Sequence, residues 1–317
     1  MRYRTLGHTG ASVSVLGFGA SPLGDVFGKT EATERNRCVH HAVDRGINFF
    51  DVSPYYGKTL AEERLGEALV GKREQVFLAT KCGRYDTNYF DFSRDRIKRS
   101  IDESLARLRT DRVDLLQAHD VEFGDARQIA EETIPALREI QQEGKARFIG
   151  ITGYCLGVMK KIAEQAPVDT ILSYCRYNLL STDMDAILTP FARTRGIGLI
   201  NASPLHMGIL TATGAPAWHP APENVKHAGA AIVKLCRQSG VDPSQVALRF
   251  CLHHPYTATT LVGMSTVEQV DKNIGALTLE IDPELLVQIE KIAAPVKDAI
   301  WKSGRDENAD RQQTGEC

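Results

Sequence analysis

Short apolar runs along the chain alternate with longer stretches in which apolar residues recur every three or four positions. The short runs are rich in β-branched residues and predict strands, and the longer stretches have the period of amphipathic helices. Strands are predicted at 13–20, 47–53, 76–81, 113–119, 147–153, 170–175, 197–203 and 259–264. Strands that alternate with helices are typical of parallel βαβ units. Eight such units predict an α/β fold, a single (β/α)8 barrel of the TIM type.

Helix boundaries are marked by residues suited to helix ends. The clearest helix is predicted at 93–109, where apolar residues four, four and three positions apart form one stripe. The next, at about 127–142, stops before Gly144, a residue suited to the left-handed conformation that ends many helices. Capping residues also mark the starts of three later helices, at Asp242, Thr266 and Asp282. The last of these helices falls outside the repeat.

The main alternative for alternating strands and helices is a doubly wound sheet. That fold usually carries a Gly-x-Gly-x-x-Gly fingerprint after its first strand. Here Gly17 and Gly19 are followed by Gly24, which breaks the spacing. We therefore predict one barrel domain over residues 1–301. Residues 302–317 are polar and have no periodicity, which predicts a disordered tail.

Composition and charge disfavour several classes of protein. The chain has 317 residues, of which 43% are hydrophobic and 25% charged, and its formal net charge is −2. Nucleic-acid binding is disfavoured because this balance leaves no basic surface. A membrane span is disfavoured because no apolar run reaches about 18 residues. The first residues contain no apolar signal stretch, so we expect a cytoplasmic protein.

The seven cysteines indicate neither disulfides nor a metal site. Their number is odd, and no Cys-x-x-Cys pair occurs. Scattered thiols are typical of a reducing compartment. Cys82 is of interest only because it follows a candidate catalytic lysine. His253 and His254 are adjacent and so do not share a helix face, and no metal is predicted.

Polar side chains gather at the ends of three successive predicted strands. Asp51 and Tyr56 follow the second strand. Lys81 closes the third strand, and His119 closes the fourth. Catalytic residues of such barrels lie at the carboxyl ends of the strands, so we expect all four side chains to point toward one mouth. Lysine is rarely buried without a partner, which favours a functional role for Lys81.

These four residue types together support acid–base chemistry on an oxygen atom. Free tyrosine has a pKa of about 10, and a neighbouring lysine ammonium lowers that pKa by favouring the phenolate. An aspartate beside the lysine keeps it charged and oriented. A neutral histidine can hold a substrate oxygen toward the tyrosine. Such a set moves a proton on or off an alcohol or carbonyl, but it cannot move a hydride, so a nicotinamide cofactor is implied.

Two signatures and a loop resemble those of the aldo-keto reductases. Residues 46–57 read GINFFDVSPYYG and resemble one signature, and residues 102–116 resemble a second. Residues 203–205, Ser-Pro-Leu, resemble a later loop, and the resemblance extends over nearly all of residues 3–277. It implies a (β/α)8 barrel that uses NAD or NADP without a doubly wound domain. It also implies four roles: Tyr56 as acid and base, Lys81 and Asp51 as its tuning pair, and His119 as the group that orients the substrate.

Further runs are similar to the branch of the family that oxidises L-galactose, L-fucose and related aldoses. They lie at 17–24, 79–85, 171–175, 218–220 and 261–265. The resemblance implies oxidation of a sugar at its anomeric C1 to a lactone, with Tyr56 taking the proton of the C1 hydroxyl.

Other functions stay open. Within enzymology the alternatives are an NADPH-dependent reductase of aldehydes or ketones and a pyridoxal-type alcohol dehydrogenase. A non-catalytic binding subunit, of the kind that accompanies ion channels, is disfavoured because no basic or unusually apolar stretch marks a partner surface.

NAD is the predicted cofactor, with NADP as the alternative. The family reads the adenosine end with the segment around the last strand and helix, and members that use NADP usually place lysine or arginine where Gly263 and Gln269 stand. A 2′-phosphate needs such basic groups, whereas Glu268 and Asp271 add negative charge here. The resemblance places three more residues at this end of the cofactor, Ser265, Thr266 and Asn273.

The nicotinamide end departs from the family pattern. Many members hold the carboxamide with Ser-Asn after the fifth strand, whereas this chain has Thr152-Gly153. The usual glutamine of the sixth strand is replaced by Tyr174 or Ser173, and the usual stacking ring aligns with Ala202. The resemblance assigns the pyrophosphate loop to Ser203, Leu205 and Gly208.

The only partner we expect is a small sugar substrate, and its contacts are predicted in the loops. Trp218 and His219 lie in a long loop after the seventh strand, where the family shapes its pocket. A tryptophan face suits the apolar side of a sugar ring. Further candidates for the mouth are Tyr85, Asp120, Phe27 and Trp301. The sequence indicates no oligomeric state.

Overall fold

In the computed structural model, which describes residues 1–26 and 28–310, parallel strands close into an eight-stranded barrel. The order around the barrel is β10-β11-β12-β3-β4-β5-β8-β9. These strands are β3 (Leu16–Gly19), β4 (Phe49–Asp51), β5 (Phe77–Cys82), β8 (Val113–Ala118), β9 (Ala146–Gly153), β10 (Thr170–Tyr174), β11 (Gly198–Ala202) and β12 (Thr259–Gly263). Each overlaps a strand predicted from the sequence, and the predicted (β/α)8 barrel is confirmed.

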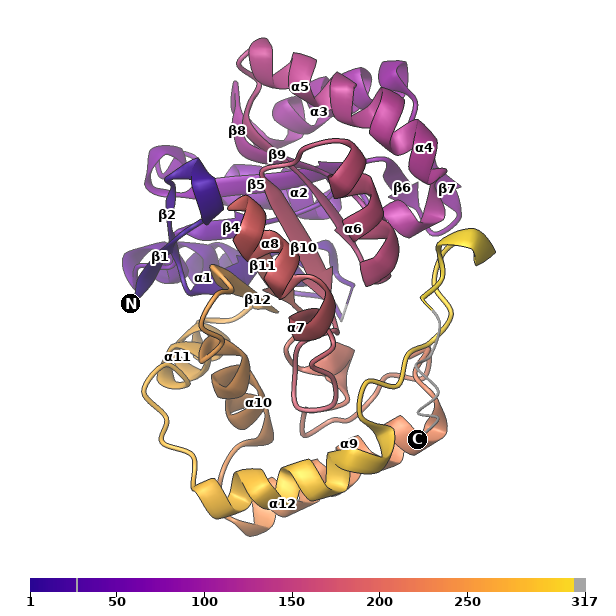
Figure 1. Cartoon of the computed structure of the whole chain (residues 1–317). Helices are drawn as coiled ribbons and strands as arrows, with labels where there is room; N and C mark the ends of the chain where they lie inside the picture. Colours follow the sequence, from indigo (N-terminus) through magenta and orange to yellow (C-terminus); the bar gives the residue numbers. More distant parts are fainter. Residues whose placement is uncertain (27, 311–317) are drawn as a thin grey trace.

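Helices cover the outside of the barrel (Figure 1). Those that connect its strands are α1 (Ala32–Asp44), α2 (Leu60–Ala68), α3 (Arg94–Leu108), α4 (Ala126–Gln128), α5 (Ile134–Gln142), α6 (Leu156–Gln165), α7 (Met184–Ile187), α8 (Thr189–Arg195), α10 (Pro243–Leu252) and α11 (Val267–Gly275). The predicted helix at 127–142 contains a π-helical turn at Ile129–Thr133, between α4 and α5. Outside the repeat, α9 (Glu223–Gln238) and α12 (Pro283–Ala293) pack against each other.

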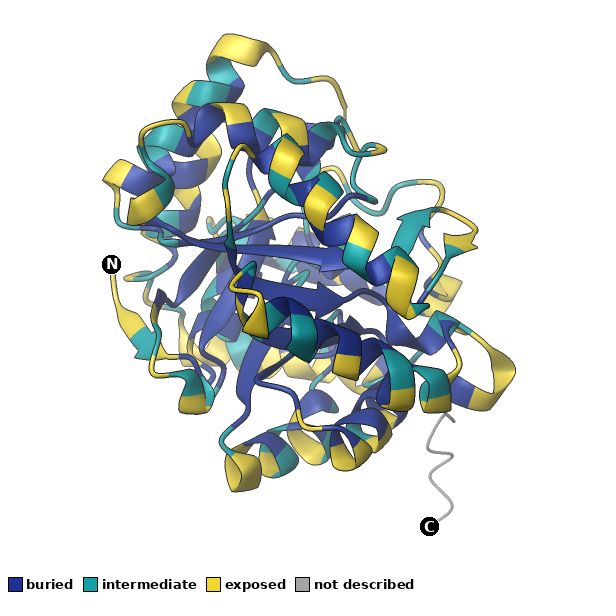
Figure 2. Cartoon of the chain, turned by 90° about the horizontal axis from the view of Figure 1, so that it is seen from above, coloured by how far each residue is buried: buried dark blue, intermediate teal, exposed yellow. Residues whose placement is uncertain are grey.

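Helix α3 shows how the apolar pattern becomes a packed surface. Ile97, Ile101 and Leu108 are buried against the barrel together with the small side chains of Ser100 and Ser104, while the charged positions of the helix are exposed or half-buried, as on the other outer helices in Figure 2. Each such side chain contributes roughly 1.5–3 kcal/mol on burial. Arg109 ends the helix in the left-handed conformation at φ 53°. The predicted capping residues of the later helices, Asp242, Thr266 and Asp282, all accept hydrogen bonds from first-turn amides.

Two hairpins flank the barrel. At its amino-terminal end, β1 (Tyr3–Thr5) pairs with β2 (Ser12–Ser14), so the first part of the predicted strand 13–20 belongs to a hairpin instead of the barrel. At the carboxyl end, β6 (Arg84–Asp86) pairs with β7 (Tyr89–Phe90). No helix in the described part of the chain is long and apolar enough to span a membrane.

The amino-terminal hairpin closes one end of the barrel. Leu6 is fully buried in the same apolar cluster as the barrel residues Phe49 and Phe77. Gly7 adopts φ 53°, and a Cβ there would lie 2.3 Å from the Gly198 nitrogen. A glycine is therefore needed for the hairpin to approach the barrel this closely.

The segment that follows α12 crosses the carboxyl end of the barrel. The Asn308 side chain donates to the Glu122 carbonyl at 2.9 Å. The Asp310 carboxylate accepts from two amides at the start of α6, at 2.8 and 2.9 Å. The prediction of a disordered tail is therefore wrong for residues 302–310, because polar contacts instead of an apolar stripe hold them. Residues 311–317 lie outside the described part of the chain.

Candidate active site

A cavity of about 840 Å³ lies at the carboxyl end of the barrel strands. Asp51 ends β4, and Lys81 lies near the end of β5. His119 follows β8 directly, and Tyr56 comes from the loop after β4. All four predicted catalytic side chains line this cavity. Three neighbouring strands of the barrel therefore bring them together, as the motif order along the chain predicts.

Lys81 connects the aspartate to the tyrosine. Its ammonium donates to the Asp51 carboxylate, to the Val52 carbonyl at 2.9 Å and to the Tyr56 hydroxyl oxygen at 3.2 Å. A lysine ammonium has three hydrogens, and these acceptors use all of them. The Tyr56 oxygen therefore accepts from Lys81, and its own hydrogen is available to a ligand in the cavity. Gln117 donates to the second Asp51 oxygen at 3.1 Å and fixes the carboxylate from the other side.

Burial and charge act in opposite directions on these groups. Burial lowers the pKa of Lys81, but Asp51 and Tyr56 outweigh it, so the net pKa is raised and Lys81 is a cation. Burial raises the pKa of Tyr56, and the Lys81 charge only partly offsets this rise. Tyr56 therefore carries its proton at neutral pH. Lys81 lowers the pKa of Tyr56, as the sequence predicts, but burial raises that pKa by more.

His119 is neutral and has a defined tautomer. Burial, with Lys81 and Arg84 nearby, lowers the pKa of His119 well below its usual value. Its Nδ1 lies 3.0 Å from the Ser53 hydroxyl, which accepts a hydrogen bond from the Tyr55 amide at 3.1 Å. A buried hydroxyl hydrogen needs an acceptor, and among the described residues Nδ1 is the group in place to accept it, so we assign the Ser53 hydroxyl as the donor to Nδ1. The imidazole hydrogen lies on Nε2 and can be donated to an oxygen atom of a ligand.

A second ion pair, between Arg84 and Asp120, lies in the same cavity wall. Asp120 follows His119 at φ 53°, a left-handed conformation that aspartate tolerates better than most residues. Its Oδ2 pairs with Arg84, and its Oδ1 lies 3.7 Å from His119 Nε2. The Arg84 guanidinium stacks on the Tyr55 ring at 3.8 Å. A hydrogen-bond donor and an acceptor therefore lie side by side in the cavity.

A cleft of about 780 Å³ adjoins the cavity and shares Asp51 and Tyr56 with it. Its wall contains six of the residues predicted to bind the cofactor: Ser203, Leu205, Gly208, Gly263, Ser265 and Gln269. Two others, Thr152 and Tyr174, line the catalytic cavity itself. Among the described residues, no lysine or arginine belongs to the wall of this cleft. The cleft thus extends from the tyrosine to the segment before α11 without meeting a cation.

Three other predicted cofactor residues lie outside both walls. Side chains alternate along β10, so Ser173 faces away from the barrel interior, and its buried hydroxyl bonds to no described residue. Thr266 caps α11 through the Gln269 amide at 3.2 Å. Asn273 is buried within α11.

The predicted substrate residues divide into two groups. Trp218 and Asp120 line the catalytic cavity, and Trp301 lies in the same wall. Tyr85 does not reach it, because its hydroxyl accepts from the Gly83 amide at 3.1 Å. Phe27 lies outside the described residues.

His219 also lies behind the cavity wall. Its Nε2 donates to the His206 carbonyl at 3.0 Å, and its Nδ1 accepts from the Ala221 amide at 3.0 Å. Its ring packs against Trp301, with the ring centres 5.7 Å apart. Local hydrogen bonds of this kind cannot be predicted from the sequence. The sequence therefore predicted His219 in the cavity wall, whereas its ring lies behind that wall.

Several residues of the site were not predicted. Arg84, Ser53 and Gln117 hold Asp120, His119 and Asp51 respectively, and only their nearness to the strand ends signals this in the sequence. Cys82, in contrast, takes no part in the cavity wall. Its thiol faces the Gln117 carbonyl at 3.5 Å, and burial raises its pKa, so it is an unreactive filler.

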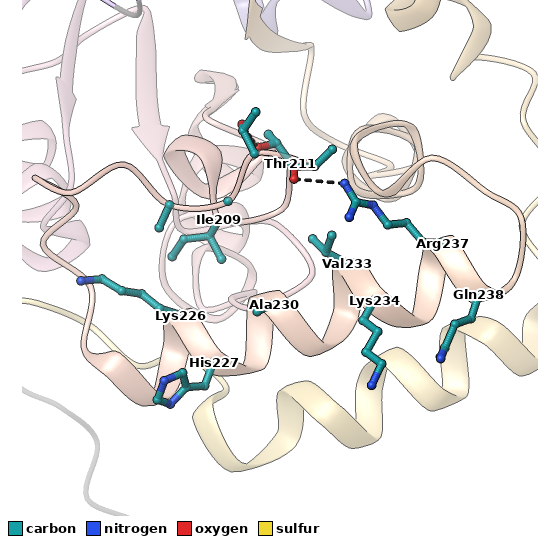
Figure 3. Close-up of a pocket in the computed structure, with 13 residues that line it drawn as sticks. Ile209, Thr211, Lys226, His227, Ala230, Val233, Lys234, Arg237 and Gln238 are labelled. Atoms are coloured by element: carbon teal, nitrogen blue, oxygen red, sulfur yellow. Dashed lines mark hydrogen bonds between the residues drawn. The ribbon is translucent and has the colours of Figure 1, made fainter.

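A separate cavity of about 670 Å³ lies between residues 209–215 and α9 (Figure 3). Its basic side chains lie along α9, where Arg237 donates to the Ala212 carbonyl at 3.1 Å. None of the predicted catalytic or cofactor residues lines it.

Comparison with known proteins identifies the family. The model of the aldo/keto reductase family matches residues 15–294. The chain belongs to this family. It is therefore an oxidoreductase.

Individual relatives extend this result. Over 316 residues the chain is 48% identical to L-galactose dehydrogenase from Arabidopsis thaliana, covering 96% of this chain and 98% of that protein. It is 28% identical to D-threo-aldose 1-dehydrogenase from a Pseudomonas species, covering 88% and 94% of the two chains. The solved holo form of an aldo-keto reductase from Bacillus halodurans matches with a TM-score of 0.78 and 28% identity, covering 96% of this chain and 100% of that one.

Proposed function

We propose that the protein is an NAD-dependent aldose 1-dehydrogenase, which oxidises a sugar of the L-galactose or L-fucose type at C1 to the lactone. The observation that carries this proposal is the 48% identity to L-galactose dehydrogenase over 96% of the chain. The name of the second relative, D-threo-aldose 1-dehydrogenase, points to the same carbon. The paired charges of the cavity suit a substrate rich in hydroxyl groups.

In this reaction, the residues of the chain bind, orient and deprotonate the C1 hydroxyl. Tyr56 takes the proton as a phenolate, and the Lys81 ammonium, 3.2 Å from its oxygen, stabilises the negative charge. Asp51 keeps Lys81 charged and in place. The Nε2–H of His119 holds the substrate oxygen beside Tyr56.

The adjoining cleft fits a dinucleotide. Gly208 adopts φ 107° in its wall, and a Cβ there would lie 3.2 Å from both the Gly214 carbonyl and the Pro216 side chain. Ser203, Leu205 and Gly208 would hold the pyrophosphate, Ser265 and Gln269 the adenosine, and Thr152 and Tyr174 the carboxamide. When bound, an oxidised nicotinamide accepts the hydride that C1 loses.

Two features favour NAD over NADP. A 2′-phosphate dianion needs a cation, and no lysine or arginine lines the cleft in the described part of the chain. In addition, Glu34 accepts a hydrogen bond from the Val267 amide at 2.9 Å. A carboxylate therefore already lies at the amino terminus of α11, where a phosphate would otherwise be favoured.

The test is an initial-rate assay of NADH formation with L-galactose, L-fucose and D-arabinose, run in parallel with NADP. We expect a clear rate with NAD on at least one sugar and a much lower rate with NADP. No rate on any of the three sugars with either cofactor, in protein that binds NADH, would overturn the proposal.

One observation favours a second candidate, the reduction of aldehydes. Burial raises the pKa of Tyr56, so at neutral pH the tyrosine is a proton donor, which reduction requires. The cofactor arm of the same assay separates the two functions. A reductase of this kind would turn over aldehydes with NADPH and would show no sugar oxidation with NAD.

A further inference from the structure

We propose that Asp120 binds the hydroxyl on the carbon next to the oxidised one and so makes the enzyme select 2-hydroxy substrates. This inference rests on the proposed function and assigns to it a specificity-determining residue. Aldoses and 2-hydroxy aldehydes carry that hydroxyl, whereas simple alcohols and aldehydes do not.

The position of Asp120 fits a second oxygen of the substrate. His119 Nε2 and the Tyr56 hydroxyl hold the reacting oxygen, and Asp120 Oδ1 lies 3.7 Å from that Nε2. This separation is too long for a direct hydrogen bond. Oxygens on adjacent carbons can lie about 3 Å apart, close to a hydrogen-bond distance. One of them can therefore accept from Nε2 while the other donates to Oδ1.

Asp120 has one oxygen available for this contact. Its Oδ2 is paired with Arg84, while its Oδ1 accepts no hydrogen bond from any residue in 1–26 or 28–310. The side chain is only 4% exposed, yet it lines the catalytic cavity. A buried carboxylate oxygen without a donor is unfavourable, so a hydroxyl group of a ligand is stabilised there.

The chemistry of a carboxylate decides which neighbour of C1 it binds. An ionised carboxylate only accepts hydrogen bonds. In a cyclic aldose, C1 lies between C2, whose hydroxyl donates, and the ring oxygen, which only accepts. Asp120 therefore attracts the C2 side and repels the ring oxygen, which fixes how the sugar enters the cavity.

Arg84 is a positioning residue for Asp120. Its guanidinium stacks on the Tyr55 ring at 3.8 Å and lies 5.2 Å from the Phe90 ring centre. These aromatic contacts hold the Arg84 guanidinium beside the Asp120 Oδ2. Burial raises the pKa of Asp120 and Arg84 opposes that rise, so the arginine favours the ionised form that accepts hydrogen bonds.

The first part of the test changes only the substrate. The wild-type protein is assayed with NAD on L-galactose and 2-deoxy-L-galactose, and with NADH on lactaldehyde and propanal. Each pair differs by the hydroxyl next to the reacting carbon. A hydrogen bond to a charged group predicts that kcat/KM favours the hydroxylated member of each pair by about 10- to 100-fold.

The second part changes the residue. D120A should reduce both preferences to within about threefold, and D120N, which keeps an uncharged acceptor oxygen, should fall between D120A and the wild type. D86N is the matched control, because Asp86 lies at the exposed rim and pairs with Lys58 at 3.3 Å. It should keep the wild-type preference. NADH binding, followed by fluorescence, shows that each variant is folded.

The outcomes separate this inference from the proposed function. Unchanged preferences in D120A and D120N, or preferences near one in the wild type, would overturn the role of Asp120. If D120A does not fold, D120N and the wild-type substrate pairs still decide the question. A wild type that oxidises no sugar would overturn the proposed function alone, because lactaldehyde and propanal still report on Asp120.

Discussion

The catalytic cavity and the cleft beside it differ sharply in charge. The cavity wall contains two buried ion pairs, Asp51–Lys81 and Arg84–Asp120. Beyond the residues that it shares with the cavity, the described wall of the cleft consists of apolar residues, glycines, hydroxyl-bearing side chains and one glutamine.

The difference follows from what each part does in the proposed reaction. A proton moves in the cavity, so negative charge develops there, and fixed partners stabilise it better than water does. The cleft only has to hold a dinucleotide, which amides and hydroxyl groups can do. Its lack of cations also leaves a 2′-phosphate without a partner, so the same contrast accounts for both the chemistry and the choice of cofactor.

The largest effect is expected from Tyr56→Phe. This variant keeps the ring and removes only the oxygen that carries the proton, so kcat should fall by about 10³-fold or more. NADH binding, measured by fluorescence titration, should stay close to that of the wild type. Activity within tenfold of the wild type would show that another group moves the proton.

Lys81→Met should reduce both activity and stability. The substitution leaves Asp51 buried without its partner, which costs about 3–5 kcal/mol in the free energy of unfolding. The double variant Lys81→Met with Asp51→Asn should recover most of that stability in urea denaturation, but not the activity. Equal stability of the two variants would argue against a buried ion pair.

The single variant Lys81→Met should also change how the oxidation rate depends on pH. Oxidation requires the Tyr56 phenolate, and burial raises the pKa of Tyr56, so the wild-type oxidation rate should rise with pH through the alkaline range. Lys81 lowers that pKa, so its removal should move the rise to still higher pH. If Lys81→Met had the same pH profile as the wild type, Lys81 would have no effect on the ionisation of Tyr56.

A smaller change is expected at the far end of the cleft. Gln269→Arg combined with Glu34→Gln supplies a cation and removes the carboxylate at the start of α11, so the NADP/NAD ratio of kcat/KM should rise by about tenfold. Gly263 is unsuitable for a lysine, because a Cβ there would lie 2.9 Å from the Pro22 ring. The Asp271 carboxylate, predicted to disfavour NADP, is instead paired with His41 and Arg45, so Asp271→Asn should leave the ratio unchanged.

The smallest effect is expected at the segment after α12. Asn308→Ala loses hydrogen bonds to the Glu122 and Gly124 carbonyls, at 2.9 and 2.8 Å. Because two bonds are lost, the free energy of unfolding should fall by about 1–2 kcal/mol. The KM for the sugar should rise modestly, since this segment supports the cavity wall. Glu307→Ala, on the same segment but exposed, should change stability by less than about 0.5 kcal/mol.

The repeated apolar pattern predicted the fold, and the strand ends predicted that the four candidate catalytic side chains lie together. The apolar runs located all eight barrel strands, and strand ends are the points that a barrel brings together. Asp51, Lys81 and His119 could therefore be placed in one mouth without knowledge of any loop.

Loop side chains could not be placed in the same way, because contacts far apart in the chain set their directions. His219 adjoins Trp218 in sequence, but its ring is held by the His206 carbonyl behind the wall. Residues 302–310 have no apolar stripe, and they are held by hydrogen bonds to the Glu122 carbonyl and from the amides at the start of α6. The pairing of Arg84 with Asp120 likewise joins β6 to the loop after β8, between residues 36 positions apart in the sequence.

The most direct test of the account follows the hydrogen at C1. L-galactose labelled with deuterium at C1 is oxidised by the wild-type protein with NAD, and both products are analysed by mass spectrometry. The account predicts that the deuterium appears in NADH and that the lactone contains none. Deuterium retained in the sugar product, with unlabelled NADH, would show that another carbon is oxidised and would contradict the central claim.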